Sequence, residues 1–254
     1  MKGLSLQNRS LSRGVAILRA FRPGTGLLGN GELAERTGLP RSSISRLTQT
    51  LTRDGYLEYC APQRAYRLGA AVLMLAHAMR VGSPVLRIAT PVMQALARRM
   101  RINVGLAVRD GSEMVYLDSA RFNPRGSQRS VVSGQGVPIE LTALGRAWLA
   151  AAPETERRVV MARLGLKRRK NWRALNGQIA DAAISVRRHG YCVASWQPQV
   201  IALAAPIVTR HYPIHVVNVS LTTDEPKDAV VRRLEQPLLA LAIHLQQRME
   251  ATDL

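Results

Sequence analysis

The most constraining feature of this sequence is the spacing of three residues near the N-terminus. Ala34, Gly38 and Ile44 follow the pattern A-x3-G-x5-I, which suits two helices joined by a tight turn. A small residue is needed where the helices cross, a glycine supplies the positive φ of the turn, and the branched residue anchors the second helix in the core. The spacing predicts a helix–turn–helix in this segment.

The residues around the pattern support this prediction. Apolar residues at helical spacing predict a first helix near residues 11–21, which ends before a Pro-Gly turn. Asn30 is expected to cap a short second helix over residues 32–37. Pro40 suits the first turn of a third helix, because its missing N–H costs nothing there.

The third helix carries polar side chains on the face away from its apolar stripe. All of them form hydrogen bonds and none is acidic: Arg41, Ser42, Ser43, Ser45, Arg46 and Gln49. Arginine reads guanine edges, glutamine reads adenine edges, and hydroxyls contact phosphates. An ordinary solvated face would also include Asp or Glu. We therefore expect this face to enter the major groove of DNA.

A β-hairpin is expected after the third helix, because residues 56–60 and 65–68 alternate like strands on either side of a turn. The turn carries Arg64 at its tip. As part of a wing, this side chain would contact an adjacent minor groove or the DNA backbone. An ordinary turn arginine is the alternative interpretation.

The net charge is compatible with a nucleic-acid partner but does not establish one. The chain has 36 Lys and Arg against 17 Asp and Glu, a formal charge of +19. Such an excess favours a polyanion or a membrane surface. However, 32 of the 36 basic residues are arginines, and an Arg-rich composition without special purpose would give the same excess.

The sequence predicts neither a membrane segment nor a secreted protein. The longest uncharged apolar run, residues 68–79, is shorter than a spanning helix requires. The N-terminus lacks the apolar region of a secretory signal. The two cysteines, Cys60 and Cys192, are too few and too distant for a disulfide framework. We expect a cytoplasmic protein without a membrane partner.

The rest of the chain predicts a second domain of mixed structure. A helix near residues 69–82 would link the two domains, so the expected boundaries are 8–70 for the DNA-binding domain and 71–254 for the linker helix and second domain. Further helices are expected at 85–100, 142–152, 172–188 and 227–249, the last kinked or started by Pro237. Strands are expected at 104–108, 114–117, 130–133, 200–208 and 215–221. This mixed order indicates an α+β protein.

Short motifs follow one another in a characteristic order along nearly the whole chain. They lie at residues 11–18, 32–47, 55–57, 66–69, 137–138, 142–147, 189–192 and 204–207. Taken together, they resemble the IclR family of bacterial transcription regulators. The resemblance implies an N-terminal winged helix–turn–helix, a linker helix and a C-terminal GAF-like α/β effector domain.

The resemblance also implies partners. These are double-stranded DNA with a palindromic operator and a small-molecule effector, an organic or aromatic acid. It further implies a homodimer or a dimer of dimers, which physical reasoning supports, because one recognition helix makes too few contacts for selective binding. The first helix and the linker helix have wide apolar faces and are the expected dimer surfaces.

By position, the resemblance places the effector pocket at Arg129, Ala143, Leu144, Trp196, Ala202, Asn218 and Ser220. Asn218 and Ser220 alternate with apolar residues and so share one sheet face. Buried polar groups there need a partner, which a ligand, a water or loop backbone would supply. Arg129 would neutralise an effector carboxylate or lie exposed, and Trp196 would act as a lid.

One departure from the family concerns the loop that carries this lid. Residues 192–199 lack the acidic residues and the glycine that many members have there. A polar contact present in some relatives is therefore lost. For this reason the chemistry of a relative's effector does not transfer to this chain.

We expect no enzyme activity, no cofactor and no metal. The five histidines do not cluster with Asp, Glu or Cys at metal spacing, and the G-x-S-x-G, Walker and Rossmann patterns are absent. The basic run Lys167, Arg168, Arg169 and Lys170 would contact phosphate or form a solvated loop. Two alternatives remain: a non-specific nucleoid or RNA-binding protein, and a small-molecule enzyme with a basic N-terminal domain.

Overall fold

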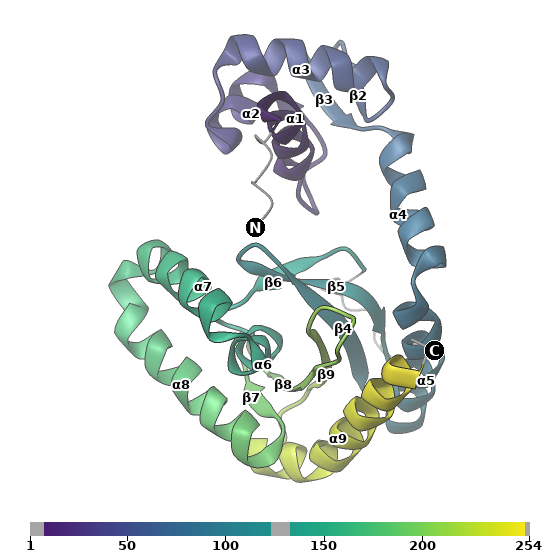
Figure 1. The fold of residues 1–254 in the computed structure, drawn as a ribbon, viewed down its shortest axis with the longest axis vertical. Coiled ribbons are helices and arrows are strands. Elements are labelled where there is room, and N and C mark those ends of the chain that lie inside the picture. Colours follow the sequence, from purple (N-terminus) through teal and green to yellow (C-terminus); the bar gives the residue numbers. More distant parts are fainter. Residues whose placement is uncertain (1–7, 123–132, 252–254) are drawn as a thin grey trace. The chain divides into compact units, whose positions relative to one another are not determined.

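The computed structural model describes residues 8–122 and 133–251 (Figure 1). The chain divides into two compact units between Gly82 and Ser83. The first contains a helix–turn–helix and a small sheet, and the second contains a large sheet with helices on both faces. The mixed α+β fold expected from the sequence is confirmed.

The first unit is a winged helix–turn–helix followed by one further helix. Its elements are α1 (Arg9–Ala20), β1 (Leu28–Gly29), α2 (Asn30–Thr37), α3 (Arg41–Arg53), β2 (Leu57–Cys60), β3 (Ala65–Leu68) and α4 (Ala70–Gly82). Strand β3 lies between β1 and β2 in an antiparallel sheet. The core is closed by Ile17, Leu33, Ile44 and Leu57, which are at most 1% exposed. One apolar side chain from each of α1, α2 and α3 and one from the hairpin therefore form the centre of this core.

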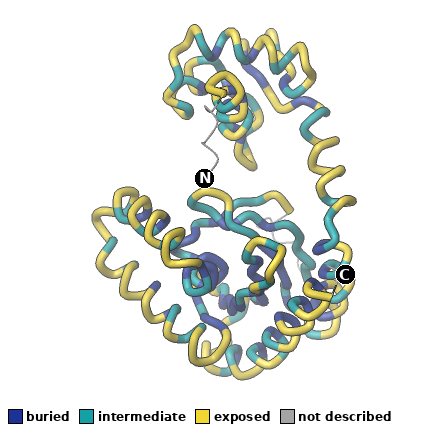
Figure 2. The backbone as a smooth tube through the Cα atoms, viewed as in Figure 1, coloured by how far each residue is buried: buried dark blue, intermediate teal, exposed yellow. Residues whose placement is uncertain are grey.

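Helix α4 differs from the other helices because none of its residues is buried (Figure 2). It groups with the first unit, whereas the sequence-based division after residue 70 assigns it to the second domain. The predicted division separates the DNA-binding domain from the linker helix and the second domain, and it stays a prediction.

The second unit is built on a six-stranded antiparallel sheet in the order β6-β5-β4-β9-β8-β7. Its strands are β4 (Asn103–Asp110), β5 (Glu113–Ala120), β6 (Gly136–Pro138), β7 (Cys192–Ala194), β8 (Val200–Ile207) and β9 (His215–Thr222). Its helices are α5 (Pro84–Met100), α6 (Ala143–Ala151), α7 (Glu154–Lys167), α8 (Trp172–His189) and α9 (Lys227–Ala251), with a 3-10 turn at Arg169–Asn171.

Helices cover both faces of this sheet (Figure 1), and a separate hydrophobic core lies on each face. Helices α5 and α9 pack on one face, where Met93 and Leu234 are fully buried. Helices α6, α7 and α8 lie on the other face, where Leu144 and Leu164 are at most 2% exposed. Along each strand, alternate side chains therefore enter different cores.

No single described helix is long and apolar enough to cross a membrane. Helices α4 and α5 are long and apolar enough only when they are counted together across the break between them.

The structure corrects several local expectations. Asn30 does not cap α2; it is the first residue of the helix, and its buried Oδ1 has no hydrogen-bond partner within the described part of the chain. Instead, Glu32 Oε2 accepts a hydrogen bond from the Gly29 N–H at 3.0 Å. Pro40 lies one residue before α3, and Pro237 lies inside a helix that starts at Lys227. Helix α7 and strands β1, β6 and β7 were not expected.

A buried ion pair ties the segment before α6 to the end of α7. The Glu140 side chain is 0% exposed, and its Oε1 accepts a hydrogen bond from Arg168 Nε at 2.7 Å. The Glu140 carbonyl accepts from Arg146 Nε at 3.1 Å. A buried carboxylate is costly without a counter-ion, so Arg168 stabilises this junction.

We expect Arg168→Ala to lower the free energy of unfolding by about 2–4 kcal/mol, because Glu140 would keep a buried charge without a partner. Urea unfolding followed by circular dichroism measures the change. Arg169→Ala removes an exposed neighbouring cation and should change stability by less than about 0.5 kcal/mol. Equal stability of the two variants would contradict the structural role of the pair.

Candidate nucleic-acid interface and ligand site

The turn between α2 and α3 has the geometry that the sequence pattern predicts. Gly38 has φ 68° and ψ 13° and ends α2 in the left-handed region. Its N–H donates a hydrogen bond to the Ala34 carbonyl at 2.9 Å. Ile44 is 0% exposed, so the turn and one buried side chain together fix the direction of α3. The predicted helix–turn–helix is confirmed.

Helix α3 separates a buried face from a polar face. Thr48 lies on the buried face with Ile44, and its hydroxyl donates within the helix to the Ile44 and Ser45 carbonyls at 2.9 and 3.1 Å. On the other side, Arg41, Ser42, Arg46 and Gln49 are exposed, while Ser43 and Ser45 are half-buried. The structure thus brings together the six residues of α3 that the sequence selected.

The polar face of α3 is positively charged over its whole length. No acidic residue occurs between Arg41 and Arg53. Arg53 is not among the predicted contact residues, although it lies two turns after Arg46 on the same face, where helical periodicity places it. Its guanidinium pairs with Asp54 at 3.1 Å, which offsets part of its charge.

The hairpin of β2 and β3 presents one arginine at its tip. Arg64 is exposed and has φ 48°, a left-handed conformation in the turn. Arg67, by contrast, pairs with Glu58 on the neighbouring strand at 2.7 Å, which raises the pKa of its guanidinium. Within the described residues the Arg64 side chain has no ion pair, so it is the hairpin cation available to a phosphate.

The residues expected to bind an effector gather mostly on the sheet face beneath α6. Ala202 pairs with Ser220 across β8 and β9, and Asn218 lies two residues before Ser220 on the same face. Ala143 and Leu144 begin α6 and are buried in the core on that side. Trp196 follows β7 and is 38% exposed. Arg129 lies outside the described residues.

Asn218 is the most informative of these residues. Its side chain is buried, and its Oδ1 has no hydrogen-bond partner within the described part of the chain. Tyr116 of β5 lies beside it, and burial raises the pKa of that phenol to about 12, against smaller opposing effects from Arg121 and from a hydrogen bond with Asn218. The phenol is therefore neutral. A hydrogen bond that lowers a phenol pKa is donated to the phenol oxygen, so it comes from the Asn218 amide N–H, and Oδ1 is left as a buried acceptor without a donor among the described residues.

Gly105 makes this arrangement possible. It lies on β4 directly opposite Asn218, and a Cβ at this position would overlap both the Tyr116 ring and Asn218 Oδ1. Burial also lowers the pKa of the neighbouring Arg121 guanidinium. Gly105, Tyr116 and Arg121 are not among the predicted site residues, although a glycine inside a strand is itself a signal of close approach.

Two observations concern a buried thiol and metal-ligating side chains. Burial raises the pKa of the Cys192 thiol to about 12, so this cysteine is protonated and unreactive at neutral pH. Within residues 8–122 and 133–251, no group of three or more His, Cys, Asp or Glu side chains could hold a metal ion.

Comparisons with known proteins match both units. The family models "IclR helix-turn-helix domain" and "Bacterial transcriptional regulator IclR C-terminal" match residues 10–60 and 77–246. The HTH-type transcriptional regulator TsaQ1/TsaQ2 of Comamonas testosteroni is 36% identical over 188 residues, which are 73% of this chain and 66% of that protein, just under two thirds.

Solved structures share the fold. An IclR family transcriptional regulator from Brucella abortus superposes with a TM-score of 0.85 at 32% identity, covering 94% of this chain and 91% of that one. An IclR homologue from Microbacterium hydrocarbonoxydans, crystallised with 4-hydroxybenzoate, has a TM-score of 0.70 at 24% identity and covers 95% and 99%.

We expect Gly105→Ala to destabilise the protein by about 1–3 kcal/mol, because the added methyl group must displace Tyr116 or Asn218. Gly177→Ala is the matched control, since a Cβ at this position in α8 meets nothing within 4 Å, and it should be neutral or stabilising. Thermal unfolding of both variants tests whether Gly105 packs closely against Tyr116 and Asn218. A Gly105→Ala variant as stable as the wild type would refute this packing.

Proposed function

Because this chain belongs to the IclR family of bacterial transcriptional regulators, we propose that it binds a palindromic DNA operator as a dimer under the control of a small organic acid. The observation that carries the proposal is the acid-free, exposed face of α3, which the Gly38 turn and buried Ile44 direct away from the core. The relatives named above are transcriptional regulators, and no catalytic role is proposed.

In the proposed complex, α3 lies in the major groove. Arg41 and Arg46 contact guanine edges or phosphates, Gln49 contacts adenine, and Ser42, Ser43 and Ser45 contact phosphates. Arg64 reaches the backbone or the adjacent minor groove from the hairpin. Each copy of the chain would read one half-site, so the spacing of the half-sites follows from the dimer.

Exposed apolar surface on the first unit supports the dimer. Five large apolar residues of α4 are more than half exposed: Leu73, Met74, Leu75, Met79 and Val81. Leu75 also lines a cavity of about 690 Å³ together with residues of α1 and α3, among them Leu11 and Val15. Apolar surface of this kind is typical of a protein interface. A homodimer, alone or within a dimer of dimers, would bury it.

The cavity lined by Leu75, Leu11 and Val15 also borders the proposed DNA-binding face of α3. Arg46 and Ser43 line it, so Arg46 lies between the dimer surface and the surface that would meet DNA. A change in how two copies pack would therefore move the recognition helices relative to each other. This is a direct physical route from the dimer interface to operator affinity.

We propose that the effector binds on the sheet face around Asn218. The unpartnered Oδ1 requires a hydrogen-bond donor, such as the hydroxyl of a hydroxy acid, and the partly buried guanidinium of Arg121 favours a carboxylate nearby. The same fold holds 4-hydroxybenzoate in the Microbacterium hydrocarbonoxydans protein, which supports an aromatic acid as one candidate. The effector alters operator affinity only as far as it binds the two conformational states differently.

We expect Arg41→Ala and Arg46→Ala each to weaken binding to the operator by about 1–3 kcal/mol without unfolding, because each removes a contact to base edges or phosphates. The operator is first selected from random duplexes with the wild-type protein, and affinity is measured by fluorescence anisotropy at several salt concentrations. Arg163→Ala in α7 is the charge-matched control.

Two results would contradict the proposed interface. If both variants bind the operator like the wild type, α3 does not use this face. If the wild type binds scrambled duplexes as tightly as the selected one, the protein is a non-specific nucleic-acid-binding protein.

We expect Asn218→Leu to keep operator binding in the absence of ligand but to lose the effector response. Benzoate, 4-hydroxybenzoate and succinate serve as probes in a thermal-shift assay, and the bound acid should lose about 1–3 kcal/mol in the variant because its donor is left unpaired. Thr209→Val, which removes a different buried side-chain oxygen that has no partner among the described residues, is the control. An unchanged thermal shift in Asn218→Leu would place the effector elsewhere.

A further inference from the structure

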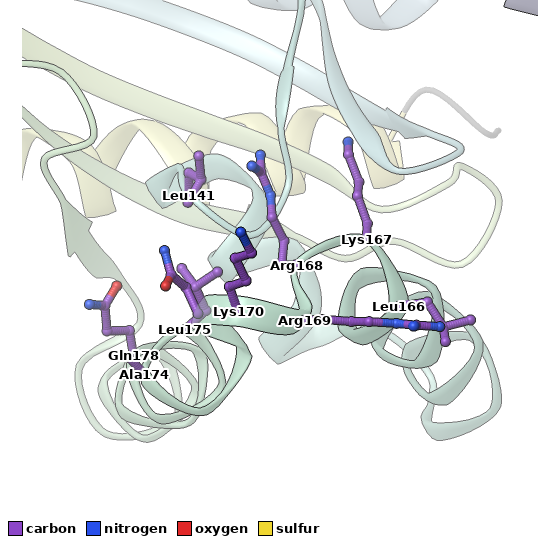
Figure 3. A pocket seen from close by; sticks show the side chains of 10 residues that line it. Leu141, Leu166, Lys167, Arg168, Arg169, Lys170, Ala174, Leu175 and Gln178 are labelled. Atoms are coloured by element: carbon purple, nitrogen blue, oxygen red, sulfur yellow. The ribbon is translucent and has the colours of Figure 1, made fainter.

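The turn between α7 and α8 surrounds a cavity that the proposed regulation does not use (Figure 3). The cavity has a volume of about 710 Å³. Its charged lining consists of four consecutive cations, Lys167, Arg168, Arg169 and Lys170, and no acidic side chain of residues 8–122 or 133–251 lines it. The effector residues of the sheet face are not part of this lining, so the cavity is a separate place on the second unit.

The positive charge in this cavity is largely uncompensated. Among the described residues, Lys167, Arg169 and Lys170 make no ion pair, and Arg168 pairs only with the buried Glu140. The side chains of Lys167, Arg168 and Lys170 extend to the same side, whereas Arg169 points along the helix toward Leu166 (Figure 3). Neighbouring cations without counter-ions repel each other, and a bound anion would relieve that repulsion.

The site stands on a fixed framework. The ion pair with the buried Glu140, at 2.7 Å, fixes the position of the Arg168 guanidinium. Arg146 contacts both sides of the junction, because its Nε donates to the Glu140 carbonyl at 3.1 Å and its Nη2 donates to Gln178 Oε1 at 2.6 Å. Gln178 itself lines the cavity. A preorganised guanidinium suits an oxyanion, because its fork matches two oxygens at once.

The remaining lining is apolar and includes Leu141, Leu166, Ala174 and Leu175. Leu166 is 66% exposed, so its side chain offers apolar surface next to the cations. The volume falls in the range of small-molecule sites. A concave site of this size suits a small ligand better than a DNA duplex, whose convex backbone would meet only the rim.

We propose that this cavity is a second ligand site, which takes a small organic phosphate. Its phosphate groups lie among Lys167, Arg168 and Lys170, and its apolar part covers Leu141, Leu166 and Leu175. The site shares no lining residue with the proposed effector face or with α3, so substitutions in either of them leave its side chains in place.

The test uses isothermal titration calorimetry on the full chain at low salt, with adenosine diphosphate, inorganic pyrophosphate and adenosine as probes. Adenosine diphosphate and pyrophosphate should bind saturably, the former more tightly, and adenosine should not bind. The double variant Lys167→Gln/Lys170→Gln should weaken both anions about tenfold or more, because it removes two cations from the site. It leaves the buried Glu140–Arg168 pair intact, so the fold is retained.

Two control variants locate the site. Arg187→Gln/Arg188→Gln removes two exposed charges from the other end of α8 and should leave binding unchanged. Arg41→Ala/Arg46→Ala should also leave it unchanged, which separates this site from the DNA-binding face. The proposal is overturned if neither anion saturates, or if the Lys167→Gln/Lys170→Gln variant binds the two anions as tightly as either control variant does.

Discussion

The left-handed turn at Gly38 is the constraint on which the DNA-binding unit depends. A side chain at φ 68° would be strained, and a different turn would send α3 in another direction. Ile44 then fixes the rotation of α3 about its own axis, because its side chain is completely buried. With direction and rotation both set, the polar residues of α3 can lie only on the outer face. This geometry places the positive charge of α3 on an accessible surface. The net charge of the chain alone does not indicate where such a surface lies.

The second unit depends on a different constraint, the separation of two cores by one sheet. Alternate residues of β9 enter different cores, so Val217 and Val219 pack against α5 and α9 while Asn218 faces α6. A polar side chain on the inner face of such a sheet is costly unless it has a partner. Gly105 makes room for Tyr116 beside it, yet no described residue donates a hydrogen bond to Asn218 Oδ1. The local cost is consistent with a surface shaped for a ligand.

Sequence periodicity predicted the long elements, and tertiary context decided the short ones. Helix α7 was not predicted because its apolar residues do not form a single stripe along one helix face. Val160 and Leu164 are buried, whereas Val159 and Leu166 are exposed. Strands β6 and β7 have three residues each and exist only through pairing with a longer neighbour. Pro237 continues α9, because the packing of residues such as Leu234 and Leu238 outweighs the lost hydrogen bond.

The sequence by itself determined the helix–turn–helix, the acid-free face of α3 and the hairpin that carries Arg64. Each of these follows from residues within a few positions of one another, so local spacing is enough. Only the tertiary structure decided that Glu140 pairs with Arg168, that Gly105, Tyr116 and Asn218 meet on one sheet face, and that the basic run after α7 lines a cavity. These contacts join residues distant in the chain. They depend on strand register, helix packing and burial, which no local pattern specifies.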